Sequence, residues 1–139
     1  MAEKKRLSGP ERQKFTIDVL RQWQGIERDA IETTAQIMEK TDNLLIRQIM
    51  EIIRNDSVQH HRVQQFIIDS MTKTPIRVSP EELAEVWGQL EAHDELERQT
   101  IELATKLKAE STDPVAKILL DYMLPDINGN LVCQRIKTN

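Results

Sequence analysis

Residues 20–34 read LRQWQGIERDAIETT, and residues 90–104 read LEAHDELERQTIELA. When the two stretches are aligned at an offset of 70 residues, the glutamate–arginine pair Glu27-Arg28 falls on Glu97-Arg98. The match continues over residues 20–64 and 90–134. It includes the identical pairs Leu20/Leu90, Ile31/Ile101, Glu32/Glu102, Asp56/Asp126 and Gln64/Gln134, and the apolar pairs Ile26/Leu96, Ile37/Leu107, Leu45/Val115 and Ile49/Leu119. A repeat of this length indicates a duplicated supersecondary unit.

Both copies carry apolar residues at spacings of three and four, which is the period of an α-helix. In the first copy these residues are Val19, Leu20, Trp23, Ile26, Ala30, Ile31, Thr34, Ile37 and Met38. The pattern predicts helices over residues 10–39, from residue 44 to near Met71, from Pro80 to about Leu107, and from Pro114 onward. A serine followed by an early proline and glutamate, at Ser8 and Ser79, predicts the starts of the first and third helices.

Four helices that each carry one apolar stripe predict an all-α four-helix bundle, built from two duplicated hairpins over residues 10–72 and 80–137 of a single domain. The link over residues 73–79 reaches only about 24 Å at full extension. A crossover along the whole bundle needs more than that. Therefore either the third helix begins nearer Val86, or neighbouring helices all run antiparallel.

The composition excludes several classes of protein. Charged residues make up 30% of the 139 residues and aromatic residues only 4%, with a net charge of −4. This balance gives no electrostatic or stacking basis for nucleic-acid binding. Cys133 is the only cysteine, so an internal disulfide, a Cys-x-x-Cys metal site and an iron–sulfur site are excluded. No apolar run reaches membrane-spanning length, and no apolar segment follows the basic start, so we expect a cytoplasmic protein without membrane contact.

Polar side chains interrupt the apolar stripes near the middle of each helix. Glu27 lies between Trp23 and Ile31, and Glu97 has the same place in the second copy. Asp56 and His60 fall within the second stripe, and their counterparts in the fourth helix are Asp126 and Asn130. A buried carboxylate is costly unless it is paired or bound to a cation, so the pattern points to a polar network or a metal.

This layout resembles the ferritin-like superfamily, and its rubrerythrin-type branch in particular, over residues 15–136. The resemblance implies two irons held by a glutamate on the first helix of each hairpin and by a Glu-x-x-His motif on each second helix. Glu27 and Glu97 match the two first-helix glutamates. His60 matches the histidine of the second helix, and Asp56 matches the acid that commonly precedes the family's glutamate.

The sequence departs from that pattern at three ligand positions. Ser57 stands where the second-helix glutamate is expected, and Ile127 and Asn130 stand where the fourth-helix glutamate and histidine are expected. The resemblance therefore implies a degenerate di-iron site that binds iron or another divalent metal weakly, or no metal at all, with oxidoreductase chemistry as an ancestral role. The candidate metal ligands are Glu27, Asp56, His60, Glu97 and Asp126. No residue is assigned as catalytic.

The alternative function is that of a non-catalytic scaffold or partner-binding protein, in which His60 pairs with Glu27 or Glu97 in a buried network without metal. His61 is then expected to face elsewhere and to be solvated. His93 precedes Glu97 by four residues, which predicts a contact along one helix.

We also expect a homodimer. Trp23, Trp87 and Phe66 cannot all be buried in one narrow core, and an apolar helix face left uncovered favours self-association.

Residues 118–137, ILLDYMLPDINGNLVCQRIK, carry a second resemblance, to response-regulator receiver domains. It implies Asp121 as a phosphoacceptor and, as a remote alternative, a receiver fragment fused to a helical hairpin. No strand ending in paired acids precedes the segment, and a lone strand has no sheet to join. We therefore expect burial to favour a helix over residues 114–124, a break over residues 125–129 and a short helix over residues 132–137.

Overall fold

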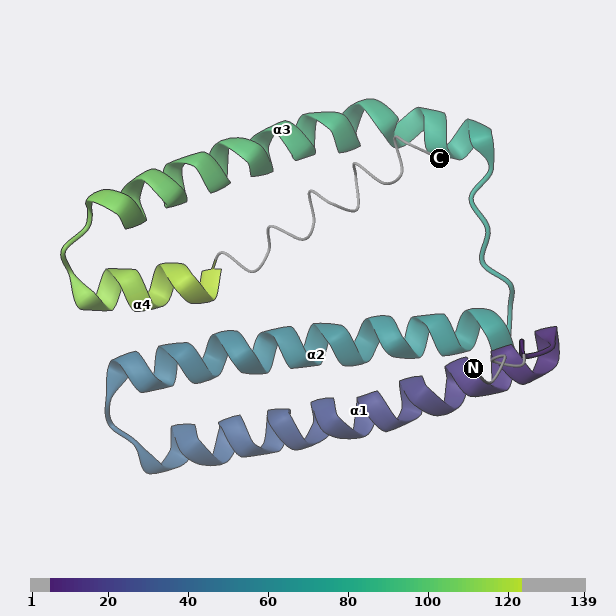
Figure 1. The fold of residues 1–139 in the computed structure, drawn as a ribbon, viewed down its shortest axis with the longest axis horizontal. Coiled ribbons are helices and arrows are strands. Elements are labelled where there is room, and N and C mark those ends of the chain that lie inside the picture. Colours follow the sequence, from purple (N-terminus) through teal and green to yellow (C-terminus); the bar gives the residue numbers. More distant parts are fainter. Residues whose placement is uncertain (1–5, 124–139) are drawn as a thin grey trace, which may run out of the picture. The chain divides into compact units, whose positions relative to one another are not determined.

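The computed structural model describes residues 6–123, and nearly all of them are helical (Figure 1). The helices are α1 (Gly9–Lys40), α2 (Leu44–Thr72), α3 (Pro80–Glu110) and α4 (Pro114–Met123). The part of the chain that the structure describes contains no strand. The predicted all-α fold class is therefore confirmed, and the third helix begins at Pro80 rather than near Val86.

The helix starts follow from local capping chemistry. At the start of α1, the Ser8 hydroxyl accepts from the backbone N–H of Glu11, and the Glu11 carboxylate accepts from the backbone N–H of Ser8. Ser79 and Glu82 form the same capping box at α3. These reciprocal bonds satisfy backbone donors that have no partner within the helix. The bonds from Ser8 also hold the pKa of the Glu11 carboxyl below its ordinary value.

The chain divides into two units between Ile76 and Arg77, and each unit contains one helical hairpin. In hairpin one, α1 and α2 lie side by side and run in opposite directions (Figure 1). In hairpin two, α3 packs against α4. That residues 1–139 form a single domain stays a prediction.

The helix boundaries repeat between the two hairpins. The first helix of each hairpin ends at Lys40 and at Glu110, and the second begins at Leu44 and at Pro114. All of these positions are related by the offset that aligns Glu27 with Glu97. The described structure therefore supports a duplicated hairpin, although α3 begins one position later than this offset predicts from α1.

Hairpin one has a polar interior. The side chains buried between α1 and α2 are Leu20, Gln24, Glu27 and Thr34 from α1, and Ser57, Gln64 and Ile68 from α2. Only Leu20 and Ile68 among them are hydrophobic. The residues facing α2 alternate at spacings of three and four, which is the packing of an antiparallel coiled coil. The centre of this seam is hydrophilic, and it includes Glu27, one of the polar residues that interrupt the apolar stripes in the sequence.

The expected break over residues 125–129 and the short helix over residues 132–137 lie outside the described residues. Up to Met123 the expected helix is present as α4. None of the helices described combines the length and the apolar character needed to cross a membrane.

Candidate functional site

Three side chains meet at the middle of hairpin one. The indole Nε1 of Trp23 donates to Glu27 Oε1 over 3.1 Å, along one turn of α1. His60 Nδ1, on α2, lies 3.3 Å from the same oxygen. Glu27 is only 7% exposed, whereas the side chain of His60 is 57% exposed. A nearly buried carboxylate is thus satisfied by one indole and one imidazole, as a buried polar group requires.

The contact between Glu27 and His60 fixes the orientation of the imidazole ring. A carboxylate oxygen only accepts hydrogen bonds, so Nδ1 of His60 must carry the proton. In the neutral ring the lone pair is then on Nε2, at the opposite edge of the imidazole. A histidine oriented by a carboxylate in this way is the usual arrangement behind a metal ligand or a proton acceptor.

His61 lies against α1 as well. Its Nε2 is 3.3 Å from Arg28 Nη1, and its backbone carbonyl accepts from Gln24 Nε2 at 3.4 Å. The expectation that His61 faces elsewhere and is solvated was therefore wrong. The reason is positional: His61 belongs to the row of α2 that also contains Ser57, Gln64 and Ile68, and that row faces α1.

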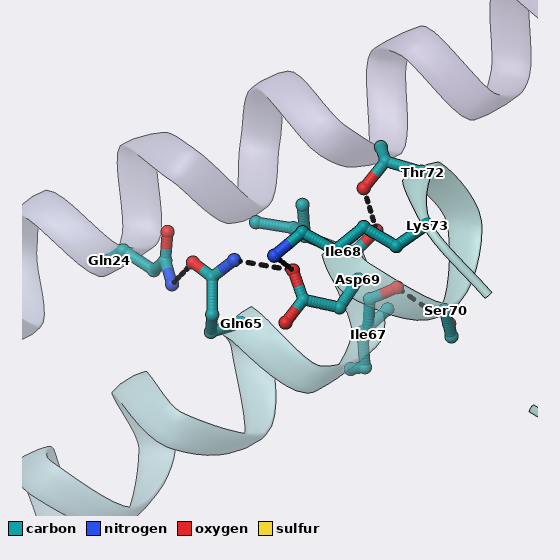
Figure 2. A network of polar contacts seen from close by, with 8 residues as sticks. All are labelled: Gln24, Gln65, Ile67, Ile68, Asp69, Ser70, Thr72 and Lys73. Atoms are coloured by element: carbon teal, nitrogen blue, oxygen red, sulfur yellow. Dashed lines mark hydrogen bonds and ion pairs between the residues drawn. The ribbon is translucent and has the colours of Figure 1, made fainter.

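A polar chain extends from the centre of hairpin one towards the end of α2 (Figure 2). Gln24 Nε2 donates to Gln65 Oε1 at 3.0 Å, and Gln65 Nε2 donates to Asp69 Oδ1 at 2.9 Å. Lys73 Nζ forms an ion pair with the same Asp69 oxygen at 3.4 Å. The bond from Gln65, followed by the contact with Lys73, lowers the pKa of the Asp69 carboxyl. Gln24 of α1 is thus connected to α2 through its hydrogen bond to Gln65.

The side chain of Gln64 differs from that of Gln24. It is 4% exposed, and neither its amide nitrogen nor its amide oxygen has a hydrogen-bond partner among the described residues. Gln64 lies on the seam one turn beyond His60. Burial of Gln24 and Gln64 could not be predicted from the sequence, because glutamine is ordinarily a surface residue.

The sequence-predicted ligands fall into three groups, one for each hairpin and one outside the described residues. Glu27 and His60 contact each other, and Asp56 lies one helical turn before His60 with an exposed side chain. Glu97 belongs to hairpin two, where its Oε1 is 3.3 Å from His93 Nε2, as predicted for residues four apart. Asp126 lies outside the described residues.

The glutamates of the two copies are contacted in the same way. Trp23 and His93 are equivalent in the repeat, and each places a ring nitrogen beside Oε1 of the glutamate four residues later. The sequence alignment did not reveal this, because tryptophan and histidine share no obvious chemistry apart from a ring nitrogen. The duplicated feature is therefore a glutamate contacted by a ring nitrogen.

Hairpin one lacks one of the ligands that the ferritin-like resemblance implies. Ser57, at the position of the missing glutamate, is buried in the seam of hairpin one. Within residues 6–123 no three side chains of histidine, cysteine, aspartate or glutamate are grouped so that they could hold a metal ion. A di-iron site of the ferritin-like type needs carboxylates and histidines from four helices.

Asp121, the phosphoacceptor position implied by the receiver resemblance, lies in α4 and forms an ion pair with Lys108 of α3. A receiver phosphoacceptor ends a β-strand, whereas this segment is helical through Met123. The apolar residues of α4 repeat at helical spacing, and Leu120 among them is buried, which is consistent with a helix rather than a strand.

The outer surface of hairpin one has one strongly apolar side. The face consists of Val19, Trp23, Ile26 and Ile37 of α1 and Leu45, Ile49, Ile52, Val63 and Ile67 of α2, and we call it the apolar face. These positions lie mostly one residue before those of the seam on both helices. Because the helices are antiparallel, the same offset turns both rows to the same side of the hairpin.

The exposure of the apolar face is substantial. Trp23 is 49% exposed and Ile26 is 61% exposed, and the face has apolar side chains towards both of its ends. Asp56 and His60 lie in its middle, and they are the only titratable residues in these two rows. Phe66 is 56% exposed but belongs to neither row, because it lies on the back of α2, pointing away from α1.

Comparisons with protein-family models, with curated proteins and with solved structures found no match to this chain. The all-α architecture with four helices in the described residues is compatible with a ferritin-like fold. The resemblance to that superfamily rests on the residues named above.

Proposed function

We propose that this chain is a non-catalytic helical assembly protein that pairs with a second copy of itself through the apolar face of hairpin one. The proposal rests on the distribution of side chains in hairpin one, which is the reverse of the usual one: polar side chains are inside and apolar side chains are outside. Gln24, Glu27 and Gln64 are buried between the two helices, whereas Trp23 and Ile26 are exposed. An apolar patch of this kind on a hairpin marks an interaction surface.

The size of the face supports a second copy as the occupant. A fully exposed aromatic side chain such as that of Trp23 has roughly 150–250 Å² of surface and an aliphatic one somewhat less, so the nine partly exposed side chains present on the order of 600 Å². A standard interface buries about 800 Å² on each partner, and about 65% of a homodimer interface is apolar. The face therefore offers about as much apolar surface as one protomer of a dimer requires.

The two polar residues of the face support the same occupant. A two-fold interface is self-complementary, so that a group on one copy meets a different group on the other. The face carries one carboxylate, Asp56, and one imidazole, His60, with a helical turn between them. Two such faces in antiparallel contact place each acid opposite an imidazole.

The test uses two substitutions at exposed apolar residues, one inside the apolar face and one outside it. Ile26→Glu places a charge in the apolar face, and we expect light scattering at tens of micromolar to show a monomer. Phe66→Glu places the same charge on the back of α2, outside the apolar face, and we expect this variant to remain a dimer. Circular dichroism checks that both variants stay helical.

Two outcomes contradict the proposal. In the first, the unmodified chain is a monomer and Ile26→Glu lowers its melting temperature, which means that the face is covered within the chain. In the second, both variants stay dimeric, which means that the dimer uses another surface.

A second candidate function, supported by the contact between Glu27 and His60, is weak binding of one divalent metal ion. Imidazole and carboxylate together suit iron, zinc and similar ions. Asp56, Glu97 and Asp126 are the further carboxylates that the sequence offers to such a site. The metal content of protein purified without chelator tests this candidate, and protein free of iron, zinc and other transition metals argues against it.

A further inference from the structure

The centre of the apolar face is polar. This polar centre lies midway between the two ends of α2. Asp56 and His60 lie on either side of the midpoint of α2, which runs from Leu44 to Thr72. Apolar side chains flank them towards both ends of the face, with Val63 on one side and Ile52 on the other. A two-fold contact that covers the whole face brings its central residues closest to the axis.

The direction of that axis decides which residues meet. If the axis lies across the helices, α2 of one copy packs on α2 of the other in the antiparallel sense. The axis then passes between Asp56 and His60, so both copies of these two residues surround it. In this arrangement each Asp56 lies opposite His60 of the second copy.

Each copy supplies two metal-competent groups to this point. The hydrogen bond from His60 Nδ1 to Glu27 leaves the Nε2 lone pair of the neutral ring available, on an imidazole that is 57% exposed. Asp56 adds an exposed carboxylate one turn away. Two donors from one chain make an incomplete site, whereas four donors from two chains complete a tetrahedral set of two nitrogens and two oxygens.

We propose that the dimer binds one zinc ion on its two-fold axis, through His60 Nε2 and the Asp56 carboxylate of both copies. This inference rests on the proposed self-pairing of hairpin one. The proposed zinc site differs from a di-iron centre in the roles of its residues. Glu27 is not a ligand but a positioning residue, which holds the His60 ring so that its Nε2 faces the second copy. Trp23 fixes Glu27 in turn by donating to the same oxygen.

The experiment is sedimentation equilibrium of the full chain with and without zinc chloride near pH 7.5, combined with a calorimetric zinc titration. We expect one zinc ion for every two chains. Because zinc binds only the dimer, free zinc at about 100 times its dissociation constant lowers the dissociation constant of the dimer by about 100-fold.

Three variants and a control assign the roles. His60→Ala and Asp56→Asn are expected to abolish the effect of zinc on dimer formation. Glu27→Gln is expected to weaken zinc binding by about 10–100-fold while the ratio of one zinc to two chains is kept, as for a residue that orients a ligand. His93→Ala, which removes the exposed histidine of hairpin two, is the matched control and should change nothing.

The outcomes separate this inference from the proposed function. A dimer whose dissociation constant does not respond to zinc overturns the zinc site but leaves the self-pairing intact. A chain that is monomeric with and without zinc overturns both. One zinc per chain without tighter dimerisation, or loss of the zinc effect in His93→Ala, also overturns the site. Dimerisation of His60→Ala without zinc shows that this variant is folded.

Discussion

Gln24 and Gln64 are chemically identical residues at facing positions of the same seam, yet we expect their substitution by leucine to have opposite effects. Gln64 is 4% exposed and has no hydrogen-bond partner among the described residues. An unpaired buried polar group costs about 1–3 kcal/mol, and leucine has a similar size. Gln64→Leu should therefore raise the free energy of unfolding by about 1–3 kcal/mol.

Gln24→Leu removes two hydrogen bonds that the structure contains, to Gln65 Oε1 at 3.0 Å and to the backbone carbonyl of His61 at 3.4 Å. At about 0.5–1.5 kcal/mol for each bond, the free energy of unfolding should fall by about 1–3 kcal/mol. The free energies of unfolding of the two variants should therefore differ by a few kcal/mol in total, although both variants replace a glutamine by a leucine.

Urea unfolding followed by circular dichroism measures both effects at one fixed protein concentration. With a denaturant slope of about 1–3 kcal/mol/M, each variant should move the midpoint by roughly 1 M, in opposite directions. Loss of stability in both variants refutes the reasoning, because it means that the Gln64 amide is paired. Gain of stability in both means that the bonds of Gln24 contribute nothing.

Three further predictions concern acidic residues and metals. Hydrogen bonds from Arg98 and Gln99 lower the pKa of the Glu95 carboxyl to about 2. A lowered pKa stabilises the folded state above the carboxyl's ordinary range, and this stabilisation is lost as the pH falls towards 2. Nuclear magnetic resonance should show Glu95 titrating near that pH, and in Arg98→Gln closer to its ordinary pKa. Titration with ferrous iron should give no more than one tight site per chain, which His60→Ala abolishes; two equivalent sites per chain would show that the ligands are misassigned. Acetyl phosphate should leave Asp121 unlabelled, because the residue lies in a helix, and labelling would revive the receiver interpretation.

The helices could be predicted from the sequence because their ends depend on neighbouring residues. Ser8 with Glu11, and Ser79 with Glu82, form capping boxes whose chemistry is complete within four residues. Asn43 caps α2 in the same local manner. The prediction of a contact between His93 and Glu97 was also correct, because it required only one helix.

The packing could not be predicted from the same pattern. Apolar residues at spacings of three and four occupy two adjacent rows of α1, and a period alone does not tell which row faces α2. In the structure the row with Gln24 and Glu27 faces α2, whereas Trp23 and Ile26 belong to the other row. The same ambiguity explains why His61 was placed wrongly.

The candidate site was predicted in part. The sequence singled out Glu27 and His60 because a carboxylate and an imidazole interrupt apolar stripes, and the structure brings these two side chains together. It did not reveal the indole of Trp23 as the second donor to Glu27, because tryptophan at that position reads as a core residue. The orientation of the His60 ring required the positions of its two nitrogens.

The measurement that tests the central claim most directly is the mass of the unmodified chain by sedimentation equilibrium, in buffer with a metal chelator, at tens of micromolar. We expect a reversible monomer–dimer equilibrium with the dimer predominant, because the apolar face alone offers on the order of 600 Å² for burial. A single species with the mass of one chain over the whole concentration range would contradict self-pairing through hairpin one.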